Sequence, residues 1–261
     1  MIASHKLRKR NIYLNKLIAF QDTEPIKVVT GIRRCGKSSL LKLMAAHLRE
    51  NGVNDEQIIE INFESYEFIK MTSDDLYQYV KERSLPGKRM YLFFDELQRM
   101  AGWENTINAF RVDLDCDIYI TGSNAKLLSG ELATYLGGRY VEFVIYPFSF
   151  GEFMELYRSI APDASIQQCF QKYLLAGGMP YLANLRYADA PSKQYLHDLF
   201  NSVQLKDIVK RNKIRDVDLL ERIIAYVIAN VGTTFSATSL AKFLKNEQRT
   251  VAPELSLYTH L

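Results

Sequence analysis

The sequence predicts an α/β fold with a parallel β-sheet at its centre. Short apolar runs alternate with segments of helical spacing from residue 26 to residue 147 of the 261-residue chain. Strands that alternate with helices form βαβ units, which place helices on both faces of a parallel sheet. From about Phe148 the pattern changes, and helical segments follow one another. We therefore expect an α/β domain first and helical segments after it.

Five short segments have the composition of buried strands, being rich in β-branched, aromatic and other apolar residues. The expected strands are Ile26–Thr30, Gln57–Phe63, Arg89–Phe94, Asp117–Thr121 and Tyr140–Tyr146.

Helical segments are expected between these strands. Residues from Leu40 to Leu48 place apolar side chains on one stripe, and Asn51–Gly52 is a stop signal. Further helices are expected over the ranges Ser73–Arg83, Trp103–Val112 and Asn124–Leu136, and Trp103 is expected to pack in the core.

Two boundaries divide the chain into a core over residues 1–150, a helical lid over 151–215 and a helix-turn-helix-like segment over 216–261. Ser149 and Glu152 have capping-box spacing at the start of the lid. The glycines and proline of AGGMP, residues 176–180, end one lid helix and begin the next. The aromatic stretch YPFSFGEF, residues 146–153, is expected to pack between core and lid rather than to stack on a base.

The composition argues against several classes of protein. The net charge is only +3, so the overall charge does not indicate binding to nucleic acid. The three cysteines are far apart in the sequence, so they indicate neither a disulfide framework nor a zinc site. The N-terminus is charged and lacks the apolar region of a secretory signal. No stretch approaches the roughly 20 apolar residues of a membrane span. We expect a cytoplasmic protein without a membrane partner.

The segment Gly31–Ser38 fits the pattern G-x-x-x-x-G-K-[ST] and lies between an expected strand and an expected helix. Glycines let the backbone turn its N–H groups toward an anion, and the following helix directs its positive end to the same place. Lys37 is expected to reach the β- and γ-phosphates, and Ser38 is expected to bind Mg²⁺. The expected nucleotide contacts along this loop are Gly31, Ile32, Arg33, Arg34, Cys35, Gly36, Lys37, Ser38 and Ser39.

Three side chains inside the loop permit two interpretations each. Arg33 and Arg34 either extend the anion contacts or face water. Nearby positive charge should favour the thiolate of Cys35, and the alternative is that Cys35 is a small buried filler.

Asp95 and Glu96 follow the apolar strand at Arg89–Phe94. Asp95 is expected in the Mg²⁺ shell, and Glu96 is expected to polarise the attacking water. A GTPase would typically carry Asp-x-x-Gly here and Asn-Lys-x-Asp elsewhere, and the sequence lacks both. ATP is therefore the expected nucleotide.

Two more polar residues are candidates for the reaction. Asn124 follows the fourth strand and is expected to orient the attacking water, unless Ser123 or Asn124 only caps the next helix. Arg139 precedes the fifth strand. It is either an arginine finger that reaches the γ-phosphate of a neighbouring subunit, or an ordinary surface arginine.

Residues 10–200 resemble the AAA+ ATPases, and specifically a bacterial and archaeal subgroup close to the STAND-type signalling ATPases. The resemblance is carried by the stretches GIRRCGKSSLL, LFFDELQ, YITGSNAKLLSGELATYLGGRYVEF, YPFSFGEF and YLLAGGMPYL. It implies a P-loop NTPase core with the sheet order 5-1-4-3-2, a helical lid and a partial winged-helix-like C-terminal segment.

The resemblance also assigns roles by position. Lys37 and Ser38 form the Walker A pair, Asp95 and Glu96 the Walker B pair, while Asn124 falls at sensor 1 and Arg139 at the finger. The segment Gly178–Pro180 resembles the lid Gly-x-Pro of the STAND relatives, where the proline lies near the nucleotide. A sensor 2 arginine is not evident. The family often continues into a further C-terminal domain, so we expect the chain to be truncated.

The C-terminal part offers two candidate contacts. Basic residues cluster in KDIVKRNKIR, residues 206–215, and form either a phosphate-binding patch or a solvated helical face. The last residues predict three short helices, and a helix-turn-helix there would contact DNA or serve only as a lid extension or protein contact.

The main hypothesis is a Mg²⁺-dependent ATPase whose turnover moves the lid. This motion is expected to act on an unknown protein partner through residues 215–261 or on DNA through residues 206–261, with a homo-oligomer formed if Arg139 acts as a finger. The alternatives are a slow nucleotide-gated switch or DNA-binding regulator with little turnover, and a mobile-element or toxin–antitoxin-like accessory.

Overall fold

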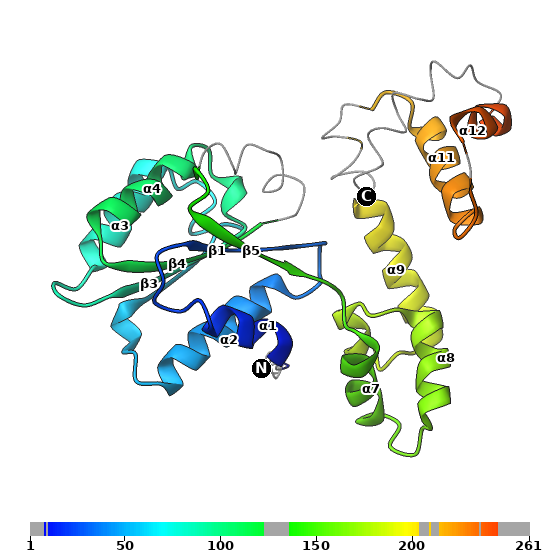
Figure 1. Ribbon diagram of the computed structural model, residues 1–261, viewed down its shortest axis with the longest axis horizontal. Coiled ribbons are helices and arrows are strands. Elements are labelled where there is room, and N and C mark those ends of the chain that lie inside the picture. The colour runs from blue at the N-terminus through cyan, green and yellow to red at the C-terminus, as the bar shows by residue number, and fades with distance from the viewer. Residues whose placement is uncertain are drawn as a thin grey trace. The chain divides into compact units, whose positions relative to one another are not determined.

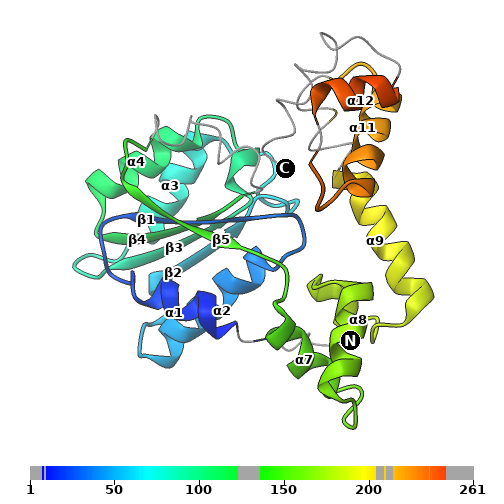
Figure 2. The same ribbon diagram turned by 45° about the vertical axis from the view of Figure 1, so that its right-hand side comes forward.

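A computed structural model describes residues 8, 10–122, 136–203, 209, 214–234 and 236–244. The described part contains one sheet of five parallel strands in the order β2-β3-β4-β1-β5, with helices above and below it (Figure 1). This arrangement confirms both the α/β fold class and the sheet order that the family resemblance implied. Figure 2 shows the strands side by side, with β1 between β4 and β5.

The strands lie close to the ranges that the sequence predicted, and β1 and β3 are buried along their whole lengths. Strands buried on both faces need continuous apolar runs rather than alternation, which explains the sequence pattern. Their bounds are β1 Ile26–Gly31, β2 Ile58–Asn62, β3 Met90–Asp95, β4 Cys116–Thr121 and β5 Tyr140–Ile145.

Two hydrophobic cores lie on the two faces of the sheet. Helices α1 (Asn11–Ile18) and α2 (Lys37–Glu50) pack on one face through residues such as Leu17, Leu40 and Met44. Helices α3 (Ser73–Arg83) and α4 (Trp103–Asp113) cover the other face. Trp103 begins α4 and is 6% exposed, so its expected packing role is confirmed.

Helix α1 was not predicted from the sequence. Only Leu14 and Leu17 of its eight residues are buried. Two buried apolar residues are too few to show helical periodicity in a sequence. The helix is therefore recognised only from the structure, where it packs on the sheet.

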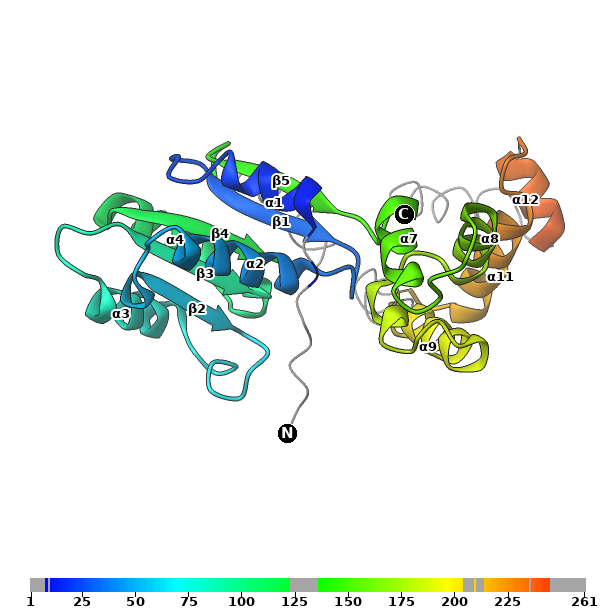
Figure 3. The ribbon, with the colours of Figure 1, turned by 90° about the horizontal axis from the view of Figure 1, so that it is seen from below.

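The lid begins directly after β5, where the chain runs into α7 (Figure 3). The predicted capping box is present at its start: Ser149 accepts from the Glu152 amide, and the Glu152 carboxylate accepts from Ser149. The lid aromatics pack on each other, with Phe153 stacked on Tyr157 and edge-on to Tyr187. The elements are α7 Phe150–Arg158, α8 Ile166–Ala176, η3 Pro180–Ala183 and α9 Asp189–Val203, while η1 (Asp55–Gln57) and η2 (Leu97–Arg99) lie in the core.

The chain divides into two compact units, residues 1–196 and 197–261, with the division inside α9. In the second unit, α11 (Val217–Ala229) packs on α12 (Ala237–Leu244) through apolar side chains. The third helix expected there, and most of the basic cluster at 206–215, lie outside the described residues. Within the described ranges, no helix has the length and apolar character to cross a bilayer.

A buried ion pair fixes the end of the sheet opposite the phosphate loop. The Lys27 ammonium contacts the Asp117 carboxylate, and both side chains are fully buried. The other carboxylate oxygen of Asp117 accepts from the Asp22 amide and the Tyr119 hydroxyl, each at 2.9 Å. Burial lowers the pKa of Lys27, and the hydrogen bond and charge of Asp117 act against that effect. The pair therefore joins β1, β4 and the turn before β1.

Replacing Asp117 by asparagine should destabilise the protein, because the Lys27 charge would stay buried without its counter-ion. We expect the free energy of unfolding in urea to fall by roughly 3–5 kcal/mol. Asp55→Asn is the matched control, since its ion pair with Arg49 is exposed and should contribute at most about 1 kcal/mol. Equal losses in the two variants would contradict the structural role of the buried pair.

Candidate functional site

The phosphate loop connects β1 to α2 and is shaped by the neighbouring strand β5. Gly31 has φ +145°, and a Cβ at this position would lie 2.3 Å from the Ile145 carbonyl oxygen. Gly36 has φ +107° and caps α2. Both glycines of the motif therefore occupy backbone conformations that L side chains rarely adopt, and at Gly31 the space is also closed.

The Lys37 side chain bends back over this loop. Its ammonium donates to the Gly31 carbonyl at 3.0 Å and to the Ile32 carbonyl at 3.1 Å. The residue is only 5% exposed. The lysine thus holds the loop closed while its charge remains at the wall of the adjoining cavity.

Asp95 ends β3 beside Ser38. The Ser38 hydroxyl donates to Asp95 Oδ1 at 3.0 Å, so the two residues that were expected to bind Mg²⁺ lie side by side. Asn62 donates to Asp95 Oδ2 at 3.2 Å, and Thr121 donates to Oδ1. The carboxylate is 8% exposed and held from three sides, so its position is fixed by the ends of neighbouring strands.

Glu96 is held by two contacts that fix its backbone and its side chain. Its φ is +56°, an uncommon conformation for a non-glycine residue that is enriched at functional sites. The Glu96 amide donates to the Thr121 hydroxyl at 3.0 Å, and Gln98 donates to the Glu96 carboxylate at 2.6 Å.

The residues Asn62, Gln98 and Thr121 were not identified from the sequence. Asn62 and Thr121 end the strands next to β3. That position is a sequence signal for the site, because the ends of parallel strands meet at one edge of the sheet. Arg10, the most connected side chain of the site, was also missed, since nothing in its sequence neighbourhood indicates a contact with the loop.

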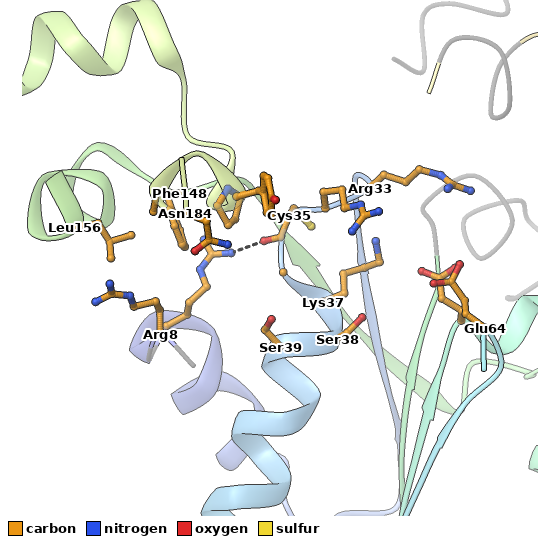
Figure 4. Close-up of a pocket in the computed structure, with 17 residues that line it drawn as sticks. Arg8, Arg33, Cys35, Lys37, Ser38, Ser39, Glu64, Phe148, Leu156 and Asn184 are labelled. Atoms are coloured by element: carbon orange, nitrogen blue, oxygen red, sulfur yellow. Dashed lines mark hydrogen bonds between the residues drawn. The ribbon is translucent and has the colours of Figure 1, made fainter. Parts of the chain in front are cut away.

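A cavity of about 560 Å³ lies over the loop (Figure 4). This volume is within the roughly 300–1,000 Å³ typical of small-molecule sites. Figure 4 shows Lys37, Ser38 and Ser39 between the lid-side residues Phe148 and Leu156 and the acidic Glu64 on the opposite wall. The lining residues are Arg8, Arg10, Arg33, Arg34, Cys35, Gly36, Lys37, Ser38, Ser39, Glu64, Glu96, Phe148, Leu156, Pro180, Tyr181, Ala183 and Asn184.

The cavity walls carry five cationic side chains, four arginines and Lys37, against two carboxylates. Convergent cations at a helix N-terminus favour an anionic ligand. Arg33 and Arg34 both line the cavity. This position is compatible with contact to an anion and with exposure to water, so both interpretations stay open.

The lid reaches the cavity through a close backbone contact. The Phe148 amide donates to the Gly178 carbonyl at 2.7 Å, and a Cβ on Gly178 would lie 2.2 Å from the Phe148 carbonyl oxygen. Pro180 begins η3 two residues later and lines the same cavity as Gly36. Pro180 therefore lines the cavity that lies over the phosphate loop, and its contact with a nucleotide stays a prediction.

Of the two interpretations of Cys35, the structure favours the small buried filler over the thiolate. Cys35 has no exposed surface, and burial raises the pKa of its thiol, while the charges of Lys37 and Arg10 only partly oppose that rise. Desolvation outweighs the nearby positive charges in setting the pKa of this thiol. Cys35 fills space next to Gly31.

One predicted residue is not brought to the cavity of its own chain. Arg139 is exposed and precedes β5 at the far edge of the sheet. The length of β5 separates it from the loop by roughly 20 Å, which exceeds the reach of an arginine side chain. Any contact of Arg139 with a phosphate loop must therefore be with that of another chain. Asn124 lies outside the described residues.

Comparison with known families decides the affiliation of the chain. The family model described as an AAA domain matches residues 23–154. The chain belongs to this AAA domain family. Its described part has the parallel sheet and the phosphate loop of a P-loop ATPase fold. A second model, for a domain of unknown function, matches residues 167–259.

Similar proteins exist in bacteria and archaea. An uncharacterised protein of Haemophilus influenzae is 38% identical over 94% of this chain, and one of Methanocaldococcus jannaschii is 28% identical over 90%. The chain spans 61% and 53% of the lengths of these two relatives. Among solved structures, a Walker-type ATPase of Pyrococcus abyssi has a TM-score of 0.56 and 21% identity, and the match covers 91% of this chain and 89% of that one, which supports the shared fold.

Replacing Gly31 by alanine should destabilise the protein more than replacing Gly52 by alanine. Both glycines have positive φ, but nothing lies within 4 Å of a Cβ at Gly52. Gly52→Ala should cost about 1–2 kcal/mol of unfolding free energy. Gly31→Ala should cost about 1–3 kcal/mol more because of overpacking against β5. Urea unfolding measures the difference, and equal costs would show that β5 does not constrain the loop.

Proposed function

We propose that this AAA-family protein binds ATP with Mg²⁺ in the cavity over the loop 31–38 and hydrolyses it. The observation that carries the proposal is that Lys37, Ser38 and Glu96 line one cavity, with Asp95 hydrogen-bonded to Ser38. Phosphoryl transfer requires mainly positioning and charge neutralisation, and these are the groups that supply both.

The pair formed by Ser38 and Asp95 fits a Mg²⁺ ion. Mg²⁺ prefers hard oxygen ligands and is usually bound through one or two carboxylates together with phosphate oxygens and water. A hydroxyl and a carboxylate 3.0 Å apart provide such a donor set at the positive end of α2. The ion would neutralise charge on the β- and γ-phosphates when bound.

Glu96 is the proposed base that polarises the attacking water. It is adjacent to Asp95, lines the cavity, and has its carboxylate oriented by Gln98. Asn124 remains the proposed residue for aligning that water, and Arg139 the proposed finger from a neighbouring chain. Both assignments rest on the family resemblance.

The lid side of the cavity is suited to the base and sugar. Phe148, Leu156, Pro180 and Ala183 provide apolar surface, and Asn184 adds an amide. An apolar wall with a few polar groups is the usual composition of such a subsite. The lid would then respond to the nucleotide, and the proposed output is lid motion transmitted to a protein partner through residues 215–261 or to DNA through residues 206–261.

The first experiment separates binding from turnover. Lys37→Ala should eliminate detectable ATP binding in calorimetry, because it removes the ammonium that closes the loop. Glu96→Gln should keep binding but slow hydrolysis by about 10²–10⁴-fold, the usual contribution of a general base. Lys42→Ala, an exposed lysine on the same helix, is the control and should leave both unchanged. Full turnover in Glu96→Gln would remove Glu96 from its role.

The second experiment tests Arg139. If Arg139 acts on a neighbour, ATPase activity per chain should rise steeply with protein concentration, and Arg139→Ala should lower it by about 10³-fold or more. A mixture of Arg139→Ala and Glu96→Gln chains should regain activity, because each supplies what the other lacks. Arg158→Ala, another exposed arginine, is the control. Activity that is independent of concentration, together with an active Arg139→Ala variant, would exclude the finger.

A further inference from the structure

Arg10 is buried next to the phosphate loop, with 5% of its surface exposed. All five N–H groups of its guanidinium are used. Three go to backbone carbonyls: Cys35 at 3.1 Å, Tyr146 at 2.9 Å and Pro147 at 3.4 Å. The other two form a bidentate pair with Glu152 at 2.7 and 3.0 Å. A guanidinium with no spare donor holds one fixed position.

These contacts join three segments that are distant in sequence. Cys35 belongs to the phosphate loop, Tyr146 and Pro147 form the link from β5 to the lid, and Glu152 lies in the first turn of α7. The rings of Tyr13 and Phe148 lie 4.5 and 5.1 Å from the guanidinium carbon. One side chain therefore contacts the loop, the linker and the lid helix together.

The contact with Cys35 has a consequence for phosphate binding. Because the peptide bond is planar and trans, the Cys35 carbonyl and the Gly36 amide point in opposite directions. Arg10 holds that carbonyl on its own side, so the Gly36 N–H is turned away from the guanidinium. Loop N–H groups of this kind cradle the phosphates of a nucleotide. Arg10 thus fixes the direction of one of the donors.

The contact with Glu152 ties the same guanidinium to the lid. Glu152 Oε2 also accepts from the amide and the hydroxyl of Ser149, which makes it part of the cap of α7. Burial alone would raise the pKa of Glu152, but the hydrogen bonds from Arg10 and Ser149 lower it, so the carboxylate is charged at neutral pH. Glu152 is not among the residues that line the cavity.

We propose that Arg10 is a positioning residue that couples the phosphate loop to the lid, orienting the Gly36 amide through the Cys35 carbonyl and anchoring α7 through Glu152. This inference rests on the proposed ATP binding. It requires that Glu152, which does not line the cavity, controls nucleotide affinity through Arg10. Lysine is not a substitute for Arg10, because an ammonium has three donors and no planar fork.

The test measures Mg²⁺-ATP affinity by calorimetry for Arg10→Lys, Glu152→Gln and the double variant. Arg10→Lys and Glu152→Gln should each weaken binding by roughly 5- to 150-fold, the usual size of coupling between sites. The double variant should bind no more weakly than the weaker single variant, because both changes break one connection. Asp189→Asn, which removes the lid ion pair with Lys172 and does not contact the loop, should bind like the wild type.

Three results would overturn the inference. Unchanged or tighter binding by Glu152→Gln, with weak binding by Arg10→Lys, would make Arg10 a direct ligand of the nucleotide. Additive losses would make the two residues independent. If Arg10→Lys and Glu152→Gln bind Mg²⁺-ATP as tightly as Asp189→Asn does, neither Arg10 nor Glu152 influences nucleotide binding. If Glu152→Gln loses the native circular dichroism spectrum, Glu152→Asp replaces it with the same expected weakening, since a shorter carboxylate cannot keep both bonds. Wild-type protein that binds no ATP would instead overturn the proposed function.

Discussion

The pairing of β1 with β4 on one side and β5 on the other is the constraint on which the site depends. All strands are parallel, so their carboxyl ends meet at one edge, where ligands bind in sheets of this kind. The pairing with β4 brings Thr121 between the loop and the end of β3. The pairing with β5 brings the Ile145 carbonyl against Gly31. The loop shape and the acidic pair thus follow from the order of the strands.

Thr121 illustrates how one hydroxyl connects the acidic pair. It donates to the Asp95 carboxylate and accepts from the Glu96 amide, so it is used in both directions. The uncommon φ of Glu96 is compatible with this contact, and Gln98 restrains the carboxylate from the other side. Strain of this kind persists only where the surroundings determine it, and the end of β4 provides those surroundings. The acidic pair is held by its neighbours before any ligand arrives.

The lid is joined to this edge by its backbone as well as by its side chains. Gly178 approaches Phe148 so closely that no side chain fits, and Arg10 binds the linker on the other side. The segment between β5 and α7 is therefore fixed at both its ends. A change at the phosphate loop has a short path to the lid through the Cys35 carbonyl, Arg10 and Glu152. Residues that lie between two sites do not by themselves show that the sites are coupled. The ATP affinity of variants at Arg10 and Glu152 measures that coupling directly.

The sequence by itself determined the alternation of strands and helices, the phosphate loop at Gly31–Ser38 and the acidic pair at Asp95 and Glu96, because each is a local pattern whose chemistry is visible in adjacent residues. Family resemblance added the strand order and the lid proline. Only the tertiary structure showed the contacts of Arg10, Asn62 and Thr121, since their partners are far away in the sequence. It also decided that Cys35 is a buried thiol and that Arg139 lies at the edge of the sheet opposite its own phosphate loop. Burial and strand order are properties of the whole fold, and no short stretch of sequence contains them.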